Sequence, residues 1–139
     1  MIWFKKYDLQ ELNDLRYNTA VEHLGINITE IGDNFLIGTM PVDNRTKQPV
    51  GILHGGASVL LAESLGSIAS YMVLDSGKFR AVGLEINANH LRMVKDSYVT
   101  GKAIAVHIGK KTHVWSIEIS DKDGKLACIS RLTMAVIEV

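Results

Sequence analysis

Residues 54–74, HGGASVLLAESLGSIASYMVL, decide the fold of this 139-residue chain. Apolar side chains fall on almost every side of a helix drawn through this stretch, which is typical of a helix buried over most of its surface. The turn-forming segment Asp75-Ser-Gly77 ends the pattern. Because Glu63 and several serines interrupt the apolar run, we expect a central core helix and no membrane span.

The sequence after this helix, and a short stretch before it, predicts a sheet. Strands are expected at residues 35–40, 82–89, 98–107, 113–120 and 126–137. Asp121-Lys-Asp-Gly124 predicts a hairpin turn, and short links of this kind require antiparallel pairing. The order of elements therefore predicts an α+β fold, an antiparallel sheet of about five strands wrapped around one long helix.

A shorter helix is expected ahead of the sheet. Asp8 and Glu11 form a capping pair, so we place a helix at about Leu9–Ala20, extended to His23, with Gly25 as its stop. The sequence shows no linker, repeat or low-complexity tract. We therefore expect one domain over residues 1–139.

Composition excludes several classes of protein. Hydrophobic residues make up 47% of the chain and charged residues 22%, so the chain is not disordered. Fifteen basic and fifteen acidic side chains give a net charge of zero, which argues against a nucleic-acid partner and permits self-association. Cys128 is the single cysteine, and the five histidines include no helical i, i+4 pair, so we expect neither a disulfide nor a metal site. With no signal-peptide pattern at the start, we expect a soluble cytoplasmic protein without a membrane partner.

Glu63 is the most informative single residue. It shares one helix stripe with Ser67 and Ser70, in a helix that is otherwise largely apolar. Burying an ionised carboxylate costs several kcal/mol unless it has a partner or a task, so we interpret Glu63 as an active-site carboxylate. The alternative is that Glu63 reaches solvent at the helix edge or bonds to neighbouring backbone.

The start of the helix carries a second signal. His54-Gly55-Gly56 leaves backbone N–H groups at a helix N-terminus, where they can polarise a carbonyl that is being attacked. Gly55 and Glu63 are eight residues apart, or about 12 Å along a helix axis. Both groups must approach one carbonyl to within about 3 Å, so one helix cannot supply both. If both residues are catalytic, two antiparallel copies of the helix must form two shared sites in a dimer.

Several longer motifs surround these residues. They are Met-Pro-Val-Asp at 40–43, Arg-Thr-Lys-Gln-Pro at 45–49, Leu-His-Gly-Gly-Ala-Ser at 53–58, Leu-Ala-Glu-Ser at 61–64 and Val-Gly-Leu-Glu-Ile-Asn-Ala-Asn-His at 82–90. Through them the chain resembles the hotdog-fold acyl-CoA thioesterases over essentially its whole length. It is most similar to the bacterial aryl-CoA subgroup, which includes the 1,4-dihydroxy-2-naphthoyl-CoA thioesterases of menaquinone biosynthesis.

This resemblance implies a role for each matching residue. Gly55 matches the residue whose backbone N–H polarises the thioester carbonyl, and Gln48 matches a side chain that assists there. Glu63 matches the catalytic carboxylate, as nucleophile or as general base on water, while His54 and Ser67 match supporting residues. The family's hotdog fold is usually assembled as a homotetramer of two dimers. No cofactor is implied, because coenzyme A is part of the substrate.

Basic residues in two loops are expected to contact the nucleotide of coenzyme A. His90 and Arg92 follow one predicted strand, and Gly109, Lys110 and Lys111 link two others. A glycine in such a link can expose backbone N–H groups to a phosphate. The alternative is that these side chains are simply solvated, as most basic residues in loops are.

Two other functions are compatible with the same residues. One is a hotdog-fold acyl dehydratase or hydratase, since His54 opens the helix. The other is a non-catalytic acyl-CoA-binding module, which would not need Glu63. The sequence leaves the substrate open between an aryl-CoA, such as dihydroxynaphthoyl-CoA or a benzoyl type, a fatty acyl-CoA and an acyl-carrier thioester.

Overall fold

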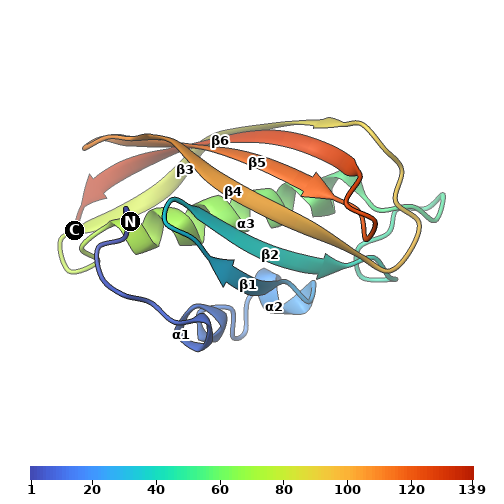
Figure 1. The fold of residues 1–139 in the computed structure, drawn as a ribbon, viewed down its shortest axis with the longest axis horizontal. Coiled ribbons are helices and arrows are strands. Elements are labelled where there is room, and N and C mark those ends of the chain that lie inside the picture. Colours follow the sequence, from blue (N-terminus) through green and yellow to red (C-terminus); the bar gives the residue numbers. More distant parts are fainter.

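The computed structural model describes residues 1–139 and consists of one antiparallel sheet curved around a long helix (Figure 1). The elements are α1 (Leu9–Asp14), α2 (Ala20–His23), β1 (Asn27–Ile31), β2 (Phe35–Pro41), α3 (Gly55–Val73), β3 (Phe79–His90), β4 (Tyr98–Ile108), β5 (Thr112–Ser120) and β6 (Leu126–Glu138). The strand order is β1-β2-β4-β5-β6-β3, with every neighbouring pair antiparallel. This confirms the predicted α+β hotdog architecture, with six strands in place of about five.

The central helix forms where the sequence predicts it. His54 is the N-cap of α3, and the helix is 19 residues long. By length and composition α3 could cross a membrane, but half of its apolar window is buried inside the chain. Figure 1 shows α3 lying along the concave face of the sheet, where the buried half of this window is part of the protein core.

Two paired glycines let α3 approach the sheet closely. Gly38 of β2 lies opposite Gly101 of β4, and a Cβ atom at either position would come within 2.8 Å of Leu65. Leu65 is completely buried between them. Burial of such a side chain contributes about 2–3 kcal/mol, so this contact fixes the height of α3 over the sheet.

The segment predicted as one helix near the N-terminus is two short helices. Asp8 caps α1 as expected, since its side chain accepts a hydrogen bond from the Glu11 N–H at 2.8 Å. The helix nevertheless ends after six residues. Asn18 then adopts a positive φ of 55° and Thr19 is extended, which breaks the helical hydrogen-bond ladder before α2 begins. Gly25 follows α2 with φ 69°, so it ends the second helix and not a single long one.

Strand β1 was not predicted, and it forms one edge of the sheet. It is only five residues long, and Ile28 is its one buried residue. The opposite edge is β3, which is twelve residues long and largely exposed. A β-bulge between Gly83 and Glu85 interrupts the pairing of β3 with β6. The long outer edge of β3 has no partner strand within the chain.

Candidate active site

The start of α3 presents an unpaired amide. The His54 carbonyl accepts from the N–H groups of Ala57 and Ser58, and His54 Nδ1 accepts from the Gly56 N–H at 2.8 Å. The Gly55 N–H has no acceptor within the chain. A Cβ atom at Gly55 would lie 2.9 Å from His90 Nε2, so glycine also keeps this approach open. A donor at a helix N-terminus suits an anion or a developing oxyanion.

Gly55 opens onto a cleft that contains other predicted site residues. The cleft has a volume of about 600 Å³ and is bordered by Gln48, Gly55, His90 and Arg92. The side-chain oxygen Oε1 of Gln48 accepts a hydrogen bond from the Val50 N–H, which leaves the side-chain Nε2 as a free donor. The cleft therefore brings two hydrogen-bond donors and two basic side chains to one place.

The orientation of the His54 ring is fixed by its role as the N-cap of α3. Because His54 Nδ1 accepts from the Gly56 N–H, the neutral ring carries its proton on Nε2. His54 is exposed, so this N–H is available to solvent or to a ligand. His54 thus fixes the first turn of α3 and adds a donor near Gly55.

Glu63 lies on a different part of the surface. It is half-buried, and its carboxylate has no hydrogen-bond or ion-pair partner within the chain. Glu63 Oε1 lies 2.7 Å from the position that a Cβ atom of Gly83 would occupy, directly beneath the edge strand β3. A cavity of about 290 Å³ contains Glu63 and Ser67 and is otherwise mostly apolar. In the single chain the carboxylate is therefore only half-buried, since β3 ends the sheet at this position.

The serine stripe divides between two environments. Ser67 shares the Glu63 cavity and contacts Met134 Sδ at 3.8 Å. Ser70 is completely buried and hydrogen-bonds to His113 and Trp115 instead. Only Ser67 therefore remains close to the carboxylate.

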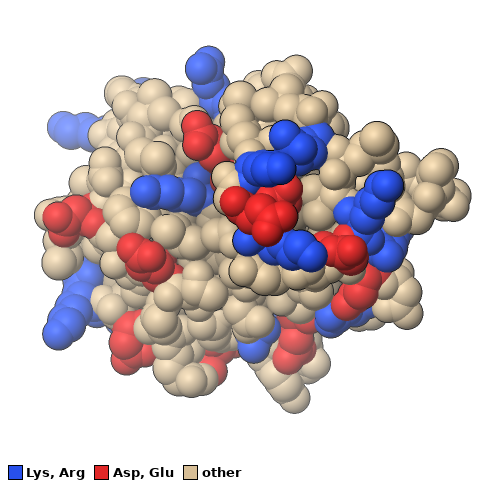
Figure 2. Space-filling view, turned by 45° about the vertical axis from the view of Figure 1, so that its right-hand side comes forward, with Lys and Arg blue, Asp and Glu red and all other residues tan.

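The predicted nucleotide contacts form two separate groups. His90 and Arg92 border the Gly55 cleft, whereas Gly109, Lys110 and Lys111 lie beyond the opposite end of α3. A 19-residue helix is about 27 Å long, so one chain does not bring the two groups together. Figure 2 shows basic and acidic side chains interspersed on the face in view, without an extended patch of one sign.

Gly83 is a site residue that sequence reasoning did not single out. A glycine within an alternating strand often marks a bulge or a close approach, and here it marks both. That general signal was present at Gly83, although the sequence does not show which side chain approaches it.

Comparison with known proteins decides the family. The model of the thioesterase superfamily matches residues 50–128, which include the start of α3, Glu63 and strand β3. The chain belongs to the thioesterase superfamily. It is a thioester hydrolase, and the match includes both Gly55 and Glu63.

Two relatives are similar in sequence to this thioesterase over nearly their full length. A protein named 1,4-dihydroxy-2-naphthoyl-CoA hydrolase, from Escherichia coli, is 50% identical over 99% of this chain and 100% of its own. A protein named proofreading thioesterase EntH, from Cronobacter turicensis, is 48% identical over 98% of each chain.

Solved structures of thioesterases have the same fold. A mutant of thioesterase PA1618 from Pseudomonas aeruginosa superposes with a TM-score of 0.98, at 50% identity and 100% coverage of both chains. Thioesterase HI1161 from Haemophilus influenzae gives a TM-score of 0.96 at 49% identity, covering 99% of this chain and 96% of its own. The fold and the enzyme class of the chain are thus established together.

Proposed function

We propose that this thioesterase hydrolyses an acyl-CoA with an aromatic acyl group to the free acid and coenzyme A. The sequence similarity to a 1,4-dihydroxy-2-naphthoyl-CoA hydrolase over the full chain supports an aryl substrate of the menaquinone pathway. The single observation that carries the proposal is that the same helix holds a free Gly55 amide and an unpartnered Glu63 carboxylate, and that each borders its own cavity. We place the reaction in the cytoplasm, where coenzyme A thioesters are used.

The proposed site is shared between two subunits. The outer edge of β3 is long, exposed and apolar at Val82 and Leu84, and such an edge is normally covered or paired. Antiparallel pairing of β3 with the partner's β3 would set the two α3 helices antiparallel. Gly55 of one subunit would then face the partner's Glu63, as the eight-residue spacing requires. Two such dimers would form the homotetramer that the family resemblance implies.

The same pairing would unite the two basic groups. In an antiparallel β3 pair, the His90 end of one strand lies beside the Phe79 end of its partner. Phe79 borders the cavity that also contains Lys110 and Lys111. His90 and Arg92 of one subunit and the two lysines of its partner would therefore lie along one route for the coenzyme A nucleotide.

The chemistry needs only groups that the chain supplies. The Gly55 N–H and Gln48 Nε2 donate to the thioester carbonyl oxygen and stabilise the oxyanion. Glu63 either attacks the carbonyl carbon, forming an anhydride that water cleaves, or removes a proton from the attacking water. Either route expels the coenzyme A thiolate, a good leaving group, so no metal or cofactor is required.

A substrate panel tests the proposed activity. We expect kcat/KM for benzoyl-type and hydroxynaphthoyl-CoA thioesters to exceed that for hexanoyl- and decanoyl-CoA by about tenfold or more, equivalent to at least 1.4 kcal/mol of transition-state discrimination. Release of free thiol gives the rate. A preference for alkyl thioesters would replace the aryl substrate, and no release from any thioester would end the proposal.

Subunit mixing tests the shared site. Gly55→Pro removes the proposed donor at the first helical position, where proline is tolerated. Glu63→Gln removes the carboxylate. Each variant alone should be inactive, and co-expressed mixed dimers should recover up to about one intact site in two, as expected for a site built from two chains. Verified mixed dimers without any recovery would show that both groups act within one chain.

A further inference from the structure

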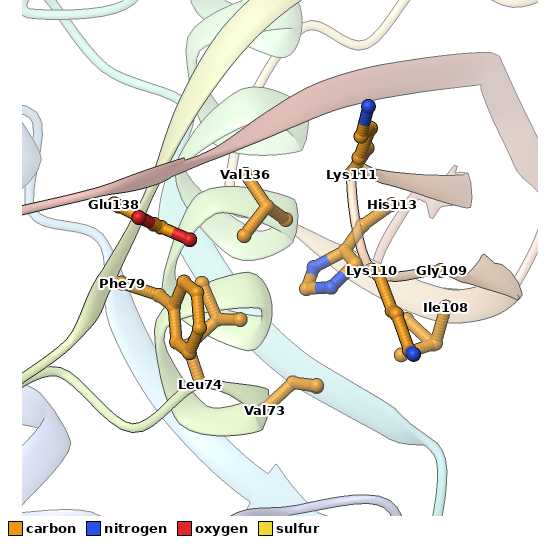
Figure 3. A pocket seen from close by; sticks show the side chains of 10 residues that line it. All are labelled: Val73, Leu74, Phe79, Ile108, Gly109, Lys110, Lys111, His113, Val136 and Glu138. Carbon is orange, nitrogen blue, oxygen red and sulfur yellow. The ribbon is translucent and has the colours of Figure 1, made fainter.

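A cavity of about 880 Å³ lies at the C-terminal end of α3, and none of Gly55, Gln48 or Glu63 borders it. Figure 3 shows side chains from several elements pointing into this common space. The apolar part of its wall is formed by Val73, Leu74, Phe79, Ile108 and Val136. Such a space is large enough for a small molecule and offers mainly apolar contact.

His113 forms one wall of this cavity and is only 1% exposed. Its Nδ1 lies 3.1 Å from Ser70 Oγ, and the Trp115 indole N–H donates to the same oxygen at 2.7 Å. An indole N–H is only a donor, so Ser70 accepts from Trp115 and its own hydroxyl proton is free for His113. All three groups are satisfied when Ser70 donates to His113 Nδ1. The neutral His113 ring then carries its proton on Nε2.

The Nε2–H of His113 has no partner in the protein. It is not enclosed by protein atoms, and the ring points into the cavity in Figure 3. Burial, with a smaller effect from nearby His107, lowers the pKa of His113, which keeps the ring neutral. The cavity therefore has one N–H donor of fixed direction in an otherwise mainly apolar wall, and only an acceptor from outside the chain can satisfy it.

Charged side chains at the rim of the cavity indicate the charge of the group that accepts this hydrogen bond. Lys110 and Lys111 extend from the turn between β4 and β5, on the His113 side, and neither forms an ion pair within the chain. Glu138 lies on the opposite side, next to Phe79 (Figure 3). An anionic group is thus attracted toward His113 and repelled from the Phe79 side.

We propose that this cavity binds an apolar carboxylic acid in its carboxylate form. One carboxylate oxygen accepts the Nε2–H of His113, the lysines neutralise the charge, and the ring or chain of the acid lies against the apolar wall. Free acids of this class are products of thioester hydrolysis, so the cavity is a product-binding site. Its lysines are those proposed above for the coenzyme A nucleotide, so the acid binds here after coenzyme A has left. Binding itself does not depend on the proposed hydrolytic mechanism.

The probe for this site is 6-bromo-2-naphthoate. Titration calorimetry of the wild-type oligomer without coenzyme A should show binding that is about tenfold tighter than that of the neutral 6-bromo-2-naphthamide. In soaked crystals, the anomalous signal of bromine should lie in the cavity beside Val73 and Val136. A bromine peak found only beside Gly55 or Glu63, or no binding at millimolar probe, would overturn the proposal.

Two variants and one control locate the binding in solution. Val136→Phe fills the cavity from the β6 wall, and His113→Phe keeps the ring but removes the donor. Each should weaken naphthoate binding about tenfold or more, because each removes space or a charge-assisted hydrogen bond. Val106→Phe adds the same bulk at an exposed position of β4 outside the cavity and should bind as the wild type does. Equal affinity in Val136→Phe and Val106→Phe would overturn the proposal, and the bromine position decides the matter if a cavity variant does not fold.

Discussion

The two edges of the sheet differ in whether the chain itself supplies hydrogen-bond partners for them. At the β1 edge, the Asn13 side chain bonds to the backbone of Ile28 as a neighbouring strand would, donating to its carbonyl at 2.9 Å and accepting from its N–H at 2.8 Å. Arg16 donates to the carbonyl of Ile26, just ahead of β1, at 3.1 Å. The chain therefore satisfies this edge with its own side chains.

The β3 edge has no such cover. Both edges contain a bulge, with Thr29 as the extra residue in β1 and Leu84 as the extra residue in β3. Thr29 is polar, whereas Leu84 is apolar and 62% exposed. The edge that lacks internal partners is also the one above Glu63. In the proposed dimer, one and the same partner surface would complete both the second edge and the active site.

Removal of the carboxylate under β3 should have the largest effect. Glu63→Gln keeps the shape of the side chain but cannot act as nucleophile or base, so kcat should fall by about 10²–10⁴-fold. Glu118→Gln, at an exposed position of β5, is the matched control and should retain wild-type kcat. Steady-state thiol release measures both variants. A loss of less than tenfold in Glu63→Gln would place the reacting group elsewhere.

The next effect concerns the β3 edge itself. Leu84→Lys places a charge at the proposed two-fold contact, where burial of an unpaired ammonium costs several kcal/mol and weakens the dimer by about 100-fold or more. Light scattering after gel filtration should show monomers at micromolar concentration, with activity lost in parallel.

Thr29→Lys makes the same substitution at the bulge of the β1 edge. This edge is already satisfied by Asn13 and Arg16, so the oligomer and the activity should remain. Dissociation by Thr29→Lys and not by Leu84→Lys would reverse the roles of the two edges.

A smaller effect is expected where β3 contacts the carboxylate. Gly83→Ala introduces a methyl group at 2.7 Å from Glu63 Oε1 and so displaces the carboxylate. A displacement near 1 Å lowers kcat by about 10²-fold with little change in KM, because positioning and not binding is disturbed. Gly77→Ala is the control, since its nearest contact is an ordinary 3.4 Å. Wild-type kcat in Gly83→Ala would show that the carboxylate has room to move.

Much of this architecture could be predicted from local sequence. The length and cap of α3 followed from a continuous apolar run that begins at His54, because helix signals lie within a few residues of each other. The separation of Gly55 from Glu63 followed from helix geometry alone, and the structure places them in different cavities.

The remaining features depend on contacts between distant residues. Strand β1 has too few apolar residues to be predicted from the alternation of apolar and polar positions. Its Ile28 backbone is hydrogen-bonded by Asn13, which is fifteen positions away in the sequence. The half-buried state of Glu63 depends on where the sheet ends. Similarly, the basic character of Arg92 and Lys110 says nothing about their lying at opposite ends of α3.

The smallest predicted effect tests the completed edge. Asn13→Ala removes both side-chain hydrogen bonds to Ile28, at about 0.5–1.5 kcal/mol each, so the free energy of unfolding should fall by about 1–3 kcal/mol. Gln10→Ala removes an exposed bond to Asp14 from the same helix and should cost less than about 0.5 kcal/mol. Urea denaturation measures both variants, and the oligomer and kcat should be unaffected because β1 lies at the opposite edge of the sheet from β3. Loss of the oligomer in Asn13→Ala would mean that the two edges are coupled through the sheet, and that β3 does not form the interface independently.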